Sequence, residues 1–247
     1  APVARALAEL GVTHRIVHTG QHYDENMSQS FFDDLMIPPP DHNLKVGSGG
    51  HGAQTGEMMI RLEPVLTAER PDWVLTYGDT NSTLAAAIVG VKLHLPVAHL
   101  EAGLRSFNRL MPEEHNRVLT DHASDLLLAP TQLAMTNLAA EGLAGRSRLV
   151  GDVMTDVCLT VAEAAGPAAL PDGIGVDEPY VLATIHRAEN TDAPERLAAI
   201  VAGLRDQPVP VVLTVHPRLR ARCQDAGIEL VGGALRTVEP YGYPDMV

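Results

Sequence analysis

The sequence lacks the long apolar runs and the cysteine pairs that mark membrane-spanning and disulfide-stabilised proteins. No uninterrupted apolar run approaches the roughly 18 residues of a membrane-spanning helix, and no signal-peptide pattern opens the chain. Its only cysteines, Cys158 and Cys223, lie far apart in helix-like stretches. A disulfide framework is therefore not expected, and a reducing cytoplasm fits the sequence best.

Positive charge is also in deficit. The 247 residues include 18 Lys and Arg against 31 Asp and Glu, which gives a formal net charge of −13. Since nucleic acids and anionic membranes bind clustered Lys and Arg, neither is an expected partner. An apolar fraction of 45% with 20% charged residues is typical of a globular protein and excludes a disordered chain.

Both ends of the sequence interrupt the pattern around them. The chain starts at Ala1 without a methionine, and Ala1–Leu10 has helix-like spacing with no strand before it. At the other end, the sequence finishes at Val247 in the middle of the alternation of strand-like and helix-like stretches. We expect both ends of a longer protein to be missing.

Residues 1–165 alternate between short β-branched apolar runs and stretches with helical spacing. The expected strands are His14–His18, Trp73–Tyr77, Pro96–Leu100, Leu126–Ala129 and Leu149–Val150. The expected helices are Asp24–Leu35, Gln54–Arg70, Thr80–Leu93, Glu114–His122, Thr131–Glu141 and Val153–Ala165. This alternation predicts an α/β domain with a parallel sheet covered by helices on both faces.

A second alternation follows a stretch rich in Gly, Pro and Asp, residues 166–179, which we interpret as a linker. Its expected elements, in order, are strand Tyr180–Ile185, helix Pro194–Leu204, strand Val209–Val215, helix Arg218–Ala226 and strand Ile228–Val231. The sequence thus predicts two Rossmann-like domains, 1–165 and 180–247, of which the second is partial.

Ionisable residues follow four of the expected strands directly: Asp79, Glu101, His186 and His216. In open α/β sheets, ligands bind outside the carboxyl ends of the strands, so these residues are candidates for a site. Taken alone, Asp79 could be the N-cap of the next helix. Grouped carboxylates, with Glu113 as a third, push their pKa values apart, which allows one to act as an acid and another as a base.

Two further patterns carry less weight. The cluster Gly47–Gly52 formally fits a dinucleotide-binding loop, but no buried strand precedes it and Asp72 lies before its strand, so we interpret it as a loop. His14 and His18 stand four residues apart on an expected strand, without the helix or Glu of a zinc motif, so no metal site is expected.

Two other histidines stand in contrasting positions. His99 lies inside an expected strand and is predicted to be a core or supporting histidine. His186, with Arg187 beside it, opens a loop, and this pair suits a diphosphate better than a metal.

Five motifs occur in order along the chain. They are Thr19-Gly20-Gln21-His22, Gly78-Asp79-Thr80, His99-Leu100-Glu101-Ala102-Gly103-Leu104-Arg105, Pro112-Glu113-Glu114-x-Asn116-Arg117 and His186-Arg187-x-Glu189-Asn190. Together they resemble the non-hydrolysing bacterial UDP-N-acetylglucosamine 2-epimerases over essentially the whole chain. The resemblance implies a glycosyltransferase-B-like fold, with a nucleotide sugar between two Rossmann-like domains. It also implies interconversion of UDP-GlcNAc and UDP-ManNAc without nicotinamide, other cofactor or metal, by elimination of UDP through 2-acetamidoglucal and re-addition.

The resemblance also implies roles for individual residues. Asp79, Glu101 and Glu113 would be the acid–base and sugar-binding carboxylates, and His186 would contact UDP and assist its departure. Arg105 and Arg117 would bind substrate or orient the carboxylates. The positions that resemble an effector site for a second UDP-GlcNAc are Gln21, Arg187 and His216. A cytoplasmic homodimer that supplies ManNAc for a surface polysaccharide is the expected context.

Several alternatives remain open. A hydrolysing 2-epimerase would release ManNAc and UDP, and a relative acting on a UDP-diacetamido-uronic acid would share the scaffold. A glycosyltransferase of the same fold, a silent UDP-sugar-binding protein and an NAD-linked oxidoreductase are less well supported. The family's opening Gly-Thr-Arg-Pro-Glu loop and later phosphate-binding residues would lie outside Ala1–Val247, so we expect an inactive protein if the polypeptide ends there.

Overall fold

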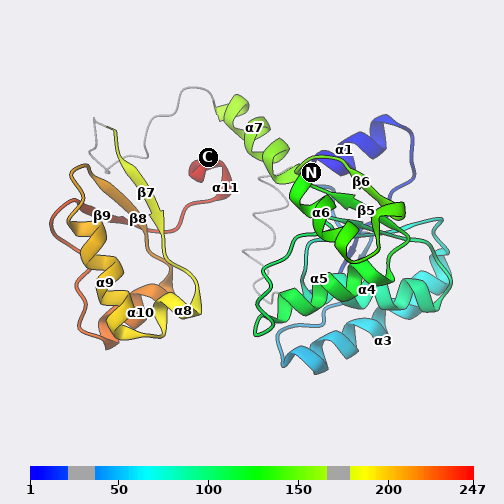
Figure 1. The fold of residues 1–247 in the computed structure, drawn as a ribbon, viewed down its shortest axis with the longest axis horizontal. Coiled ribbons are helices and arrows are strands. Elements are labelled where there is room, and N and C mark those ends of the chain that lie inside the picture. Colours follow the sequence, from blue (N-terminus) through cyan, green and yellow to red (C-terminus); the bar gives the residue numbers. More distant parts are fainter. Residues whose placement is uncertain (22–36, 166–178) are drawn as a thin grey trace. The chain divides into compact units, whose positions relative to one another are not determined.

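The computed structural model describes residues 1–21, 37–165 and 179–247 (Figure 1). The chain divides into two compact units, Ala1–Thr160 and Val161–Val247, and each is considered by itself. This division falls inside helix α7 (Val153–Ala165). The domain boundary expected after residue 165 stays a prediction, since the linker expected at 166–179 lies, except for its last residue, outside the described residues. The helix expected at Asp24–Leu35 lies outside them as well.

Unit 1 is built on a four-stranded parallel sheet with the order β3-β4-β5-β6. These strands are β3 (Val74–Tyr77), β4 (Val97–Leu100), β5 (Leu126–Ala129) and β6 (Ser147–Leu149). A separate two-stranded parallel pair joins β1 (Val17–His18) to β2 (His42–Asn43). The α/β class with a parallel sheet, which the alternating pattern predicts, is confirmed.

Helices alternate with the strands of unit 1 along the chain (Figure 1). They are α1 (Pro2–Glu9), α3 (His51–Glu69), α4 (Asn81–Lys92), α5 (Pro112–Ala123), α6 (Gln132–Ala140), the short 3-10 helix η1 (Ala144–Arg146) and α7. One core cluster joins Leu62 and Leu66 of α3 to Val97 of β4, and a second joins Leu127 of β5 to Leu138 of α6. All four residues of β4 are buried, as expected for an inner strand of a covered parallel sheet.

Unit 2 holds a three-stranded parallel sheet, β7-β8-β9. Its elements are β7 (Val181–Thr184), α8 (Ala188–Thr191), α9 (Pro194–Arg205), β8 (Val211–Thr214), α10 (Pro217–Asp225), β9 (Leu235–Val238) and α11 (Tyr243–Met246). The core of this unit packs Leu197 and Val201 of α9 and Leu219 of α10 against Leu213 of β8.

The strand expected at Ile228–Val231 is wrong. These residues have irregular backbone, and the third strand is β9, at Leu235–Val238. Ile228 and Leu230 do pack against the core, which reproduces the alternation typical of a strand. A turn at Gly232-Gly233, where both residues have positive φ, then delivers Leu235 to its partner on β8.

Smaller differences from the expected elements concern the ends of strands and the shortest elements. The strand β6 ends at Leu149 rather than continuing to Val150, and only Val17–His18 of the expected first strand pair with another segment. The short elements β2 and α8 have too few residues to produce a periodic pattern.

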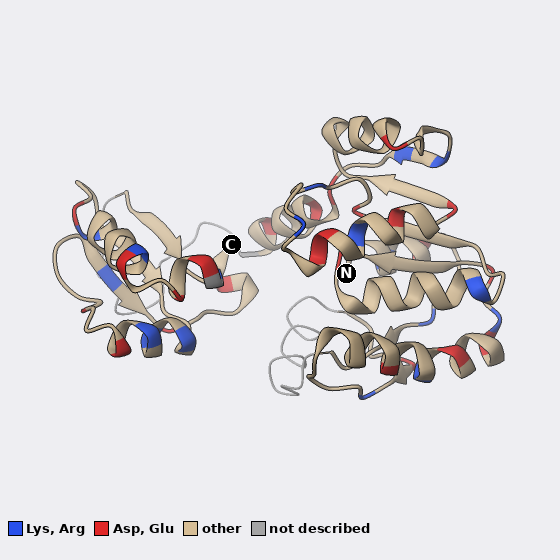
Figure 2. Cartoon of the chain, turned by 60° about the horizontal axis from the view of Figure 1, so that its bottom comes forward, with Lys and Arg blue, Asp and Glu red and all other residues tan. Residues whose placement is uncertain are grey.

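No helix among the described residues has the length and apolar character needed to cross a membrane. Figure 2 shows acidic residues on the helices of both units, with basic residues scattered among them.

Candidate active site

The loops after β3 and β4 bring two of the expected carboxylates to one edge of the unit 1 sheet. These strands are parallel neighbours, with Tyr77 opposite Leu100. The N–H of Gly78 donates to the carbonyl oxygen of Leu100 at 3.2 Å. Asp79 and Glu101 therefore follow adjacent strands at their carboxyl ends, where the topology places ligand sites.

Asp79 is held by an arginine rather than acting as a helix cap. Its carboxylate lies 2.5 Å from Nη2 of Arg117, and the side chains are 34% and 13% exposed respectively. The N-cap of α4 is Thr80, without a side-chain capping bond. From the neighbouring position on α5, Asn116 Nδ2 donates to the Asp79 carbonyl at 3.0 Å. Both the backbone and the side chain of Asp79 are thus fixed by α5.

Glu101 lies at a tight turn and makes no side-chain hydrogen bond within the described part of the chain. Its φ of +70° is unusual for a residue with a side chain. A Cβ on Gly78 would come within 3.9 Å of Glu101 Oε2, so the carboxyl group lies beside the Gly78-Asp79 turn. Burial raises the pKa of Glu101, the negative charges of Asp152 and Asp79 raise it further, and the neighbouring His99 partly opposes them.

Glu113 shares a helix face with Arg117. It lies in the first turn of α5, four residues before Arg117, and residues spaced by four share one face of a helix. This spacing places Glu113 on the face of α5 that carries Arg117, although no hydrogen bond or ion pair among the described residues joins Glu113 to Asp79 or Glu101. Glu113 is half-buried and, among the described residues, has no ion pair.

Glu114 lies in the first turn of α5, where the helix dipole favours a carboxylate, and it also makes specific contacts. Its buried carboxylate accepts hydrogen bonds from the N–H and the hydroxyl of Ser106 and from the N–H of Phe107, at 2.8–2.9 Å. Nη1 of Arg117 donates to it at 3.0 Å. Burial alone would raise the pKa of Glu114, but these donors outweigh it and lower the pKa. Glu114 therefore fixes the loop after β4 and orients Arg117.

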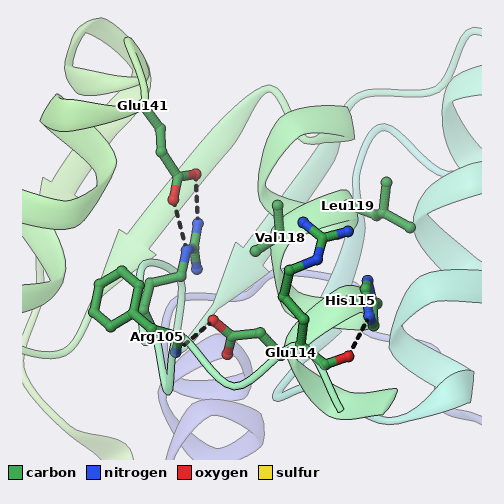
Figure 3. Close-up of a pocket in the computed structure, with 8 residues that line it drawn as sticks. Arg105, Glu114, His115, Val118, Leu119 and Glu141 are labelled. Carbon is green, nitrogen blue, oxygen red and sulfur yellow. Dashed lines mark hydrogen bonds and ion pairs between the residues drawn. The ribbon is translucent and has the colours of Figure 1, made fainter. Parts of the chain in front are cut away.

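Arg105 is enclosed by carboxylates, and its side chain is only 1% exposed. Nε and Nη2 donate to the two oxygens of Glu141 at 2.7 and 2.8 Å, and Nη1 donates to Asp121 Oδ2 at 2.7 Å. Figure 3 shows Arg105 and Glu141 facing each other. Since every guanidinium nitrogen has a partner, this geometry favours an orienting role over direct substrate binding.

A cavity of about 450 Å³ lies beside the loop after β4. It is lined by Arg105, Phe107, Arg109, Glu114, His115, Val118, Leu119 and Glu141 (Figure 3). Asp79, Glu101 and Glu113 do not line it. The cavity is therefore adjacent to the carboxylates rather than the place where they converge.

The candidate residues of unit 2 also follow strand ends. His186 comes two residues after β7 and is exposed, with Nδ1 3.5 Å from Thr184 Oγ1, and Arg187 beside it is exposed too. His216 comes two residues after β8 and caps α10, with Nδ1 accepting the N–H of Arg218 at 3.2 Å. The parallel pairing of Thr184 with Thr214 places His186 and His216 at the same edge of their sheet.

Gln21 lies in unit 1, at the start of α4. Its Oε1 accepts hydrogen bonds from the hydroxyl of Ser82 at 2.8 Å and from the Ser82 N–H at 3.3 Å. Because Gln21 belongs to unit 1 whereas Arg187 and His216 belong to unit 2, a shared effector site for these three residues stays a prediction.

Sequence reasoning missed two residues of the site. Asp152, the residue before α7, is the strongest charged influence on Glu101, and nothing in its local pattern signals that role. Asp121 accepts from Gly103 and Arg105 in the loop after β4, and its position on the buried face of α5 was the only available signal. No group of three His, Cys, Asp or Glu in the described residues is placed to hold a metal ion.

Two parallel α/β units, one with carboxylates and the other with imidazole and guanidinium at its strand ends, define a protein of the glycosyltransferase-B-like class with two Rossmann-like domains. Comparison with known proteins gives the family. The sequence profile described as UDP-N-acetylglucosamine 2-epimerase matches residues 5–247. The chain belongs to this family.

Several characterised relatives are similar over most of the chain. A UDP-2,3-diacetamido-2,3-dideoxy-D-glucuronate 2-epimerase from Pseudomonas aeruginosa is 49% identical, over 94% of this chain and 66% of its own. A UDP-N-acetylglucosamine 2-epimerase from Methanocaldococcus jannaschii is 43% identical, over 98% of this chain and 69% of its own.

Solved structures agree with these matches. A crystal structure of the Methanocaldococcus jannaschii enzyme in complex with UDP-GlcNAc and UDP superimposes with a TM-score of 0.84 at 41% identity, covering 99% of this chain and 70% of that one. The Neisseria meningitidis enzyme bound to UDP-GlcNAc gives 0.80 at 26% identity, covering 95% and 67%. The chain thus spans about two thirds of the length of the relatives that it matches.

Proposed function

We propose that this protein interconverts UDP-GlcNAc and UDP-ManNAc by inverting C2 of the sugar. The observation that carries the proposal is the convergence of Asp79 and Glu101 on one sheet edge, with Arg117 bound to Asp79 and Glu113 on the same helix. Inversion at C2 requires an acid and a base near one carbon, and a group of carboxylates in unequal environments supplies both.

The proposed reaction has two balanced halves. A base removes the C2 proton, the C–H electron pair becomes the C1–C2 double bond, and UDP leaves C1 with the electron pair of its C–O bond. The intermediate is 2-acetamidoglucal. UDP then adds back to C1 while an acid delivers a proton to the opposite face of C2, so no oxidant or reductant is consumed. General acid–base catalysis of this kind contributes about 10²–10⁴-fold.

The surroundings of the three carboxylates favour different catalytic roles. Burial and neighbouring negative charge raise the pKa of Glu101, which favours a protonated group able to deliver a proton. Asp79 is fixed by Arg117 and Asn116, which suits a positioned base. Glu113 has no ion pair in the described residues, so it is free to bind the sugar or to serve as the second base.

His186 and Arg187 are the proposed contacts of the departing diphosphate. Both are exposed, just beyond the carboxyl end of β7. A guanidinium and an imidazole stabilise the negative charge that develops on a leaving diphosphate. In a chain of net charge −13, such positive groups have to be concentrated locally.

A second substrate is favoured by one observation. The Pseudomonas aeruginosa relative, at 49% identity, is named for a UDP-diacetamido-glucuronate rather than UDP-GlcNAc. The same elimination and re-addition applies to both sugars, because the reacting C1 and C2 atoms are equivalent. We propose UDP-GlcNAc as the substrate and make the uronate the competing candidate.

Product analysis separates these possibilities. The purified 247-residue chain, and the same chain extended at both ends by its flanking sequence, are each incubated with either nucleotide sugar. The products are resolved by chromatography. We expect the UDP-linked C2 epimer of UDP-GlcNAc, at a kcat/KM above that for the uronate. Preference for the uronate would support the second candidate, free ManNAc with UDP would identify a hydrolysing enzyme, and no product from the extended chain would contradict both.

The cellular context is part of the same proposal. We propose a cytoplasmic location, as expected from a sequence with only two cysteines, Cys158 and Cys223. We propose a homodimer, for which the exposed apolar side chains Phe107, Leu110 and Leu119 offer contact area. A sedimentation coefficient matching twice 26.4 kDa would support the dimer, and one matching 26.4 kDa would contradict it.

A further inference from the structure

His99 is a fully buried polar residue whose function the catalytic proposal leaves open. It occupies the third position of β4 and is 0% exposed. On one side, Nδ1 lies 2.7 Å from Oδ1 of Asp121, which is itself 0% exposed on α5. On the other side, Nε2 lies 2.7 Å from the carbonyl oxygen of Gly78. The ring therefore bridges α5 and the turn that carries Asp79.

The hydrogen bonds of the ring fix its protonation. A carbonyl oxygen can only accept, so Nε2 must carry a hydrogen. The other oxygen of Asp121, Oδ2, accepts from the N–H of Gly103 at 3.0 Å and from Arg105 at 2.7 Å, and these two donors favour an ionised carboxylate to which Nδ1 donates. Rotating the ring by 180° would bring carbons to 2.7 Å from oxygen, shorter than the roughly 3.3–3.6 Å of a C–H···O contact.

Charge balance in the network agrees with two ring hydrogens. Charged and titratable groups reach the network from three elements: Asp121 and His122 from α5, Arg105 from the loop after β4, and Glu141 from the end of α6, with His122 Nε2 3.1 Å from Glu141 Oε2. Glu101, two residues beyond His99, is the remaining charged neighbour. Three carboxylates, Asp121, Glu141 and Glu101, therefore surround the ring against the single guanidinium of Arg105. This excess of negative charge favours a cationic ring.

We propose that His99 is a positioning residue of the candidate active site, held as a doubly protonated imidazolium. It ties the turn of Asp79 to Asp121, while Asp121 ties the loop of Glu101 through Gly103 and Arg105. The ring thereby sets the spacing of the two carboxylates and places a fixed positive charge beneath Glu101. The role in catalysis rests on the proposed epimerase function, whereas the protonation state does not.

The protonation state is tested on the ¹⁵N-labelled 247-residue chain by long-range ¹H–¹⁵N spectra of the histidine rings between pH 6 and 9. The His99 signal is assigned by its absence in His99→Gln. We expect both His99 nitrogens to carry a slowly exchanging hydrogen across this range, and Asp121→Asn to convert the ring to a neutral form. A wild-type His99 with one protonated nitrogen at pH 7 would overturn the proposal.

The positioning role is tested by kinetics on the chain extended at both ends by its flanking sequence, with a matched control. Misplacement of reacting groups by about 1 Å can cost about 10²-fold in rate. His99→Gln is therefore expected to lower kcat for C2 exchange by about that factor, with KM changed less than about threefold. The control is Thr120→Val, beside Asp121 on α5, whose buried hydroxyl has no partner in the described residues. It should leave kcat and KM unchanged.

The outcomes separate the two proposals. A folded His99→Gln enzyme with wild-type kcat would overturn the positioning role. A rise in KM with unchanged kcat would also contradict the positioning role, because the spacing of acid and base acts on the chemical step. If the wild-type chain shows no C2 exchange, the epimerase proposal fails, and the ring spectra still decide whether His99 is a buried imidazolium.

Discussion

Asp79 and Glu101 follow neighbouring strands, yet their surroundings differ sharply. Asp79 faces the guanidinium of Arg117 at 2.5 Å, whereas Glu101 has no donor in the described residues and lies near the negative charges of Asp152 and Asp79. Two carboxyl groups at the ends of adjacent strands therefore have opposite electrostatic environments. This asymmetry is what acid–base chemistry at a single carbon requires.

Replacing Asp79 by Asn should nearly abolish C2 exchange, because the amide keeps the shape but cannot take up a proton. We expect a loss of at least about 10²-fold in kcat, with an unchanged circular dichroism spectrum. Asp72→Asn is the matched control, since Asp72 is exposed just before the amino end of β3, opposite the strand end that leads to Asp79. Turnover within a factor of two of wild type for Asp79→Asn would reduce Asp79 to a structural partner of Arg117.

Glu101→Gln should raise the stability of the fold at neutral pH while it lowers activity. A carboxyl with a pKa raised by folding binds more protons in the native state than in the unfolded state. Stability therefore falls as the pH rises from the ordinary Glu pKa through the raised value. The variant lacks this titrating group. At a pH above the raised pKa of Glu101, its thermal midpoint should therefore exceed that of wild type, and at a pH below the ordinary Glu pKa the two midpoints should converge.

Denaturation followed from pH 4 to 8 measures this effect. Glu63→Gln, on the exposed side of α3, is the control and should follow the wild-type curve. A Glu101→Gln variant less stable than wild type at pH 7 would contradict the desolvated, repelled carboxyl inferred here.

Sequence reasoning located the candidate carboxylates because their positions follow from strand ends alone. It could not pair Asp79 with Arg117, which is 38 residues away, or place Asp152 near Glu101. It also assigned no contact to Glu114, since a first-turn acid on a helix is usually explained by the dipole. These contacts depend on the packing of α5 and α7, which no local pattern encodes.

At the scale of elements, α5 organises the site. Its residues reach the turn after β3 through Asn116 and Arg117, and the loop after β4 through Glu114 and Asp121. One helix of 12 residues thereby fixes both loops that carry the carboxylates. The polar face of α5 is accordingly buried at Glu114, Asn116, Thr120 and Asp121.

Gly103 tests how tightly the loop after β4 packs. It has φ of +82°, and a Cβ there would come within 2.5 Å of the carbonyl oxygen of Ala134 and 2.8 Å of Leu138. Gly103→Ala should therefore destabilise the protein by more than about 4 kcal/mol, in the range of severe backbone and packing defects. Equilibrium unfolding in urea measures the change.

Gly142 provides the control for backbone strain alone. Its φ is +78°, but nothing lies within 4 Å of an added Cβ. Gly142→Ala should cost only about 1–2 kcal/mol, the price of a left-handed conformation. Equal costs at the two positions would show that the loop after β4 is not packed against α6 as described.

The elements with strong periodicity were predictable, and those with short or broken patterns were not. The strands β3, β4 and β5 and the helices α4 and α6 lie where their sequence patterns placed them. The third strand of unit 2 was misplaced because Ile228 and Leu230 alternate like strand residues while they pack against the core from an irregular segment. Pairing partners, not local pattern, decide which such segment becomes a strand.

At the scale of the whole molecule, the two units divide the proposed work. Unit 1 carries the candidate carboxylates, and unit 2 carries the candidates His186, Arg187 and His216 beyond the carboxyl ends of β7 and β8. The two-fold alternation of strands and helices was sufficient to predict two Rossmann-like domains. The boundary between them was not, since α7 crosses the division between the compact units.

This division predicts separable defects in nucleotide binding and in chemistry. His186→Ala should weaken UDP binding by about 10-fold, as expected for loss of about 1.4 kcal/mol from a charge-assisted contact. Asp79→Asn should bind UDP within about twofold of wild type, because UDP lacks the sugar on which Asp79 acts. Isothermal titration calorimetry checks both variants, and unchanged UDP affinity in His186→Ala would remove its assigned role.

The central claim is that this protein exchanges the proton at C2 of a UDP-linked 2-acetamido sugar by elimination and re-addition. The most direct test is proton NMR of UDP-GlcNAc incubated in D₂O with the chain extended at both ends by its flanking sequence. The account predicts deuterium at C2 together with UDP-ManNAc. Complete retention of the C2 proton, by a folded protein that binds UDP, would contradict it.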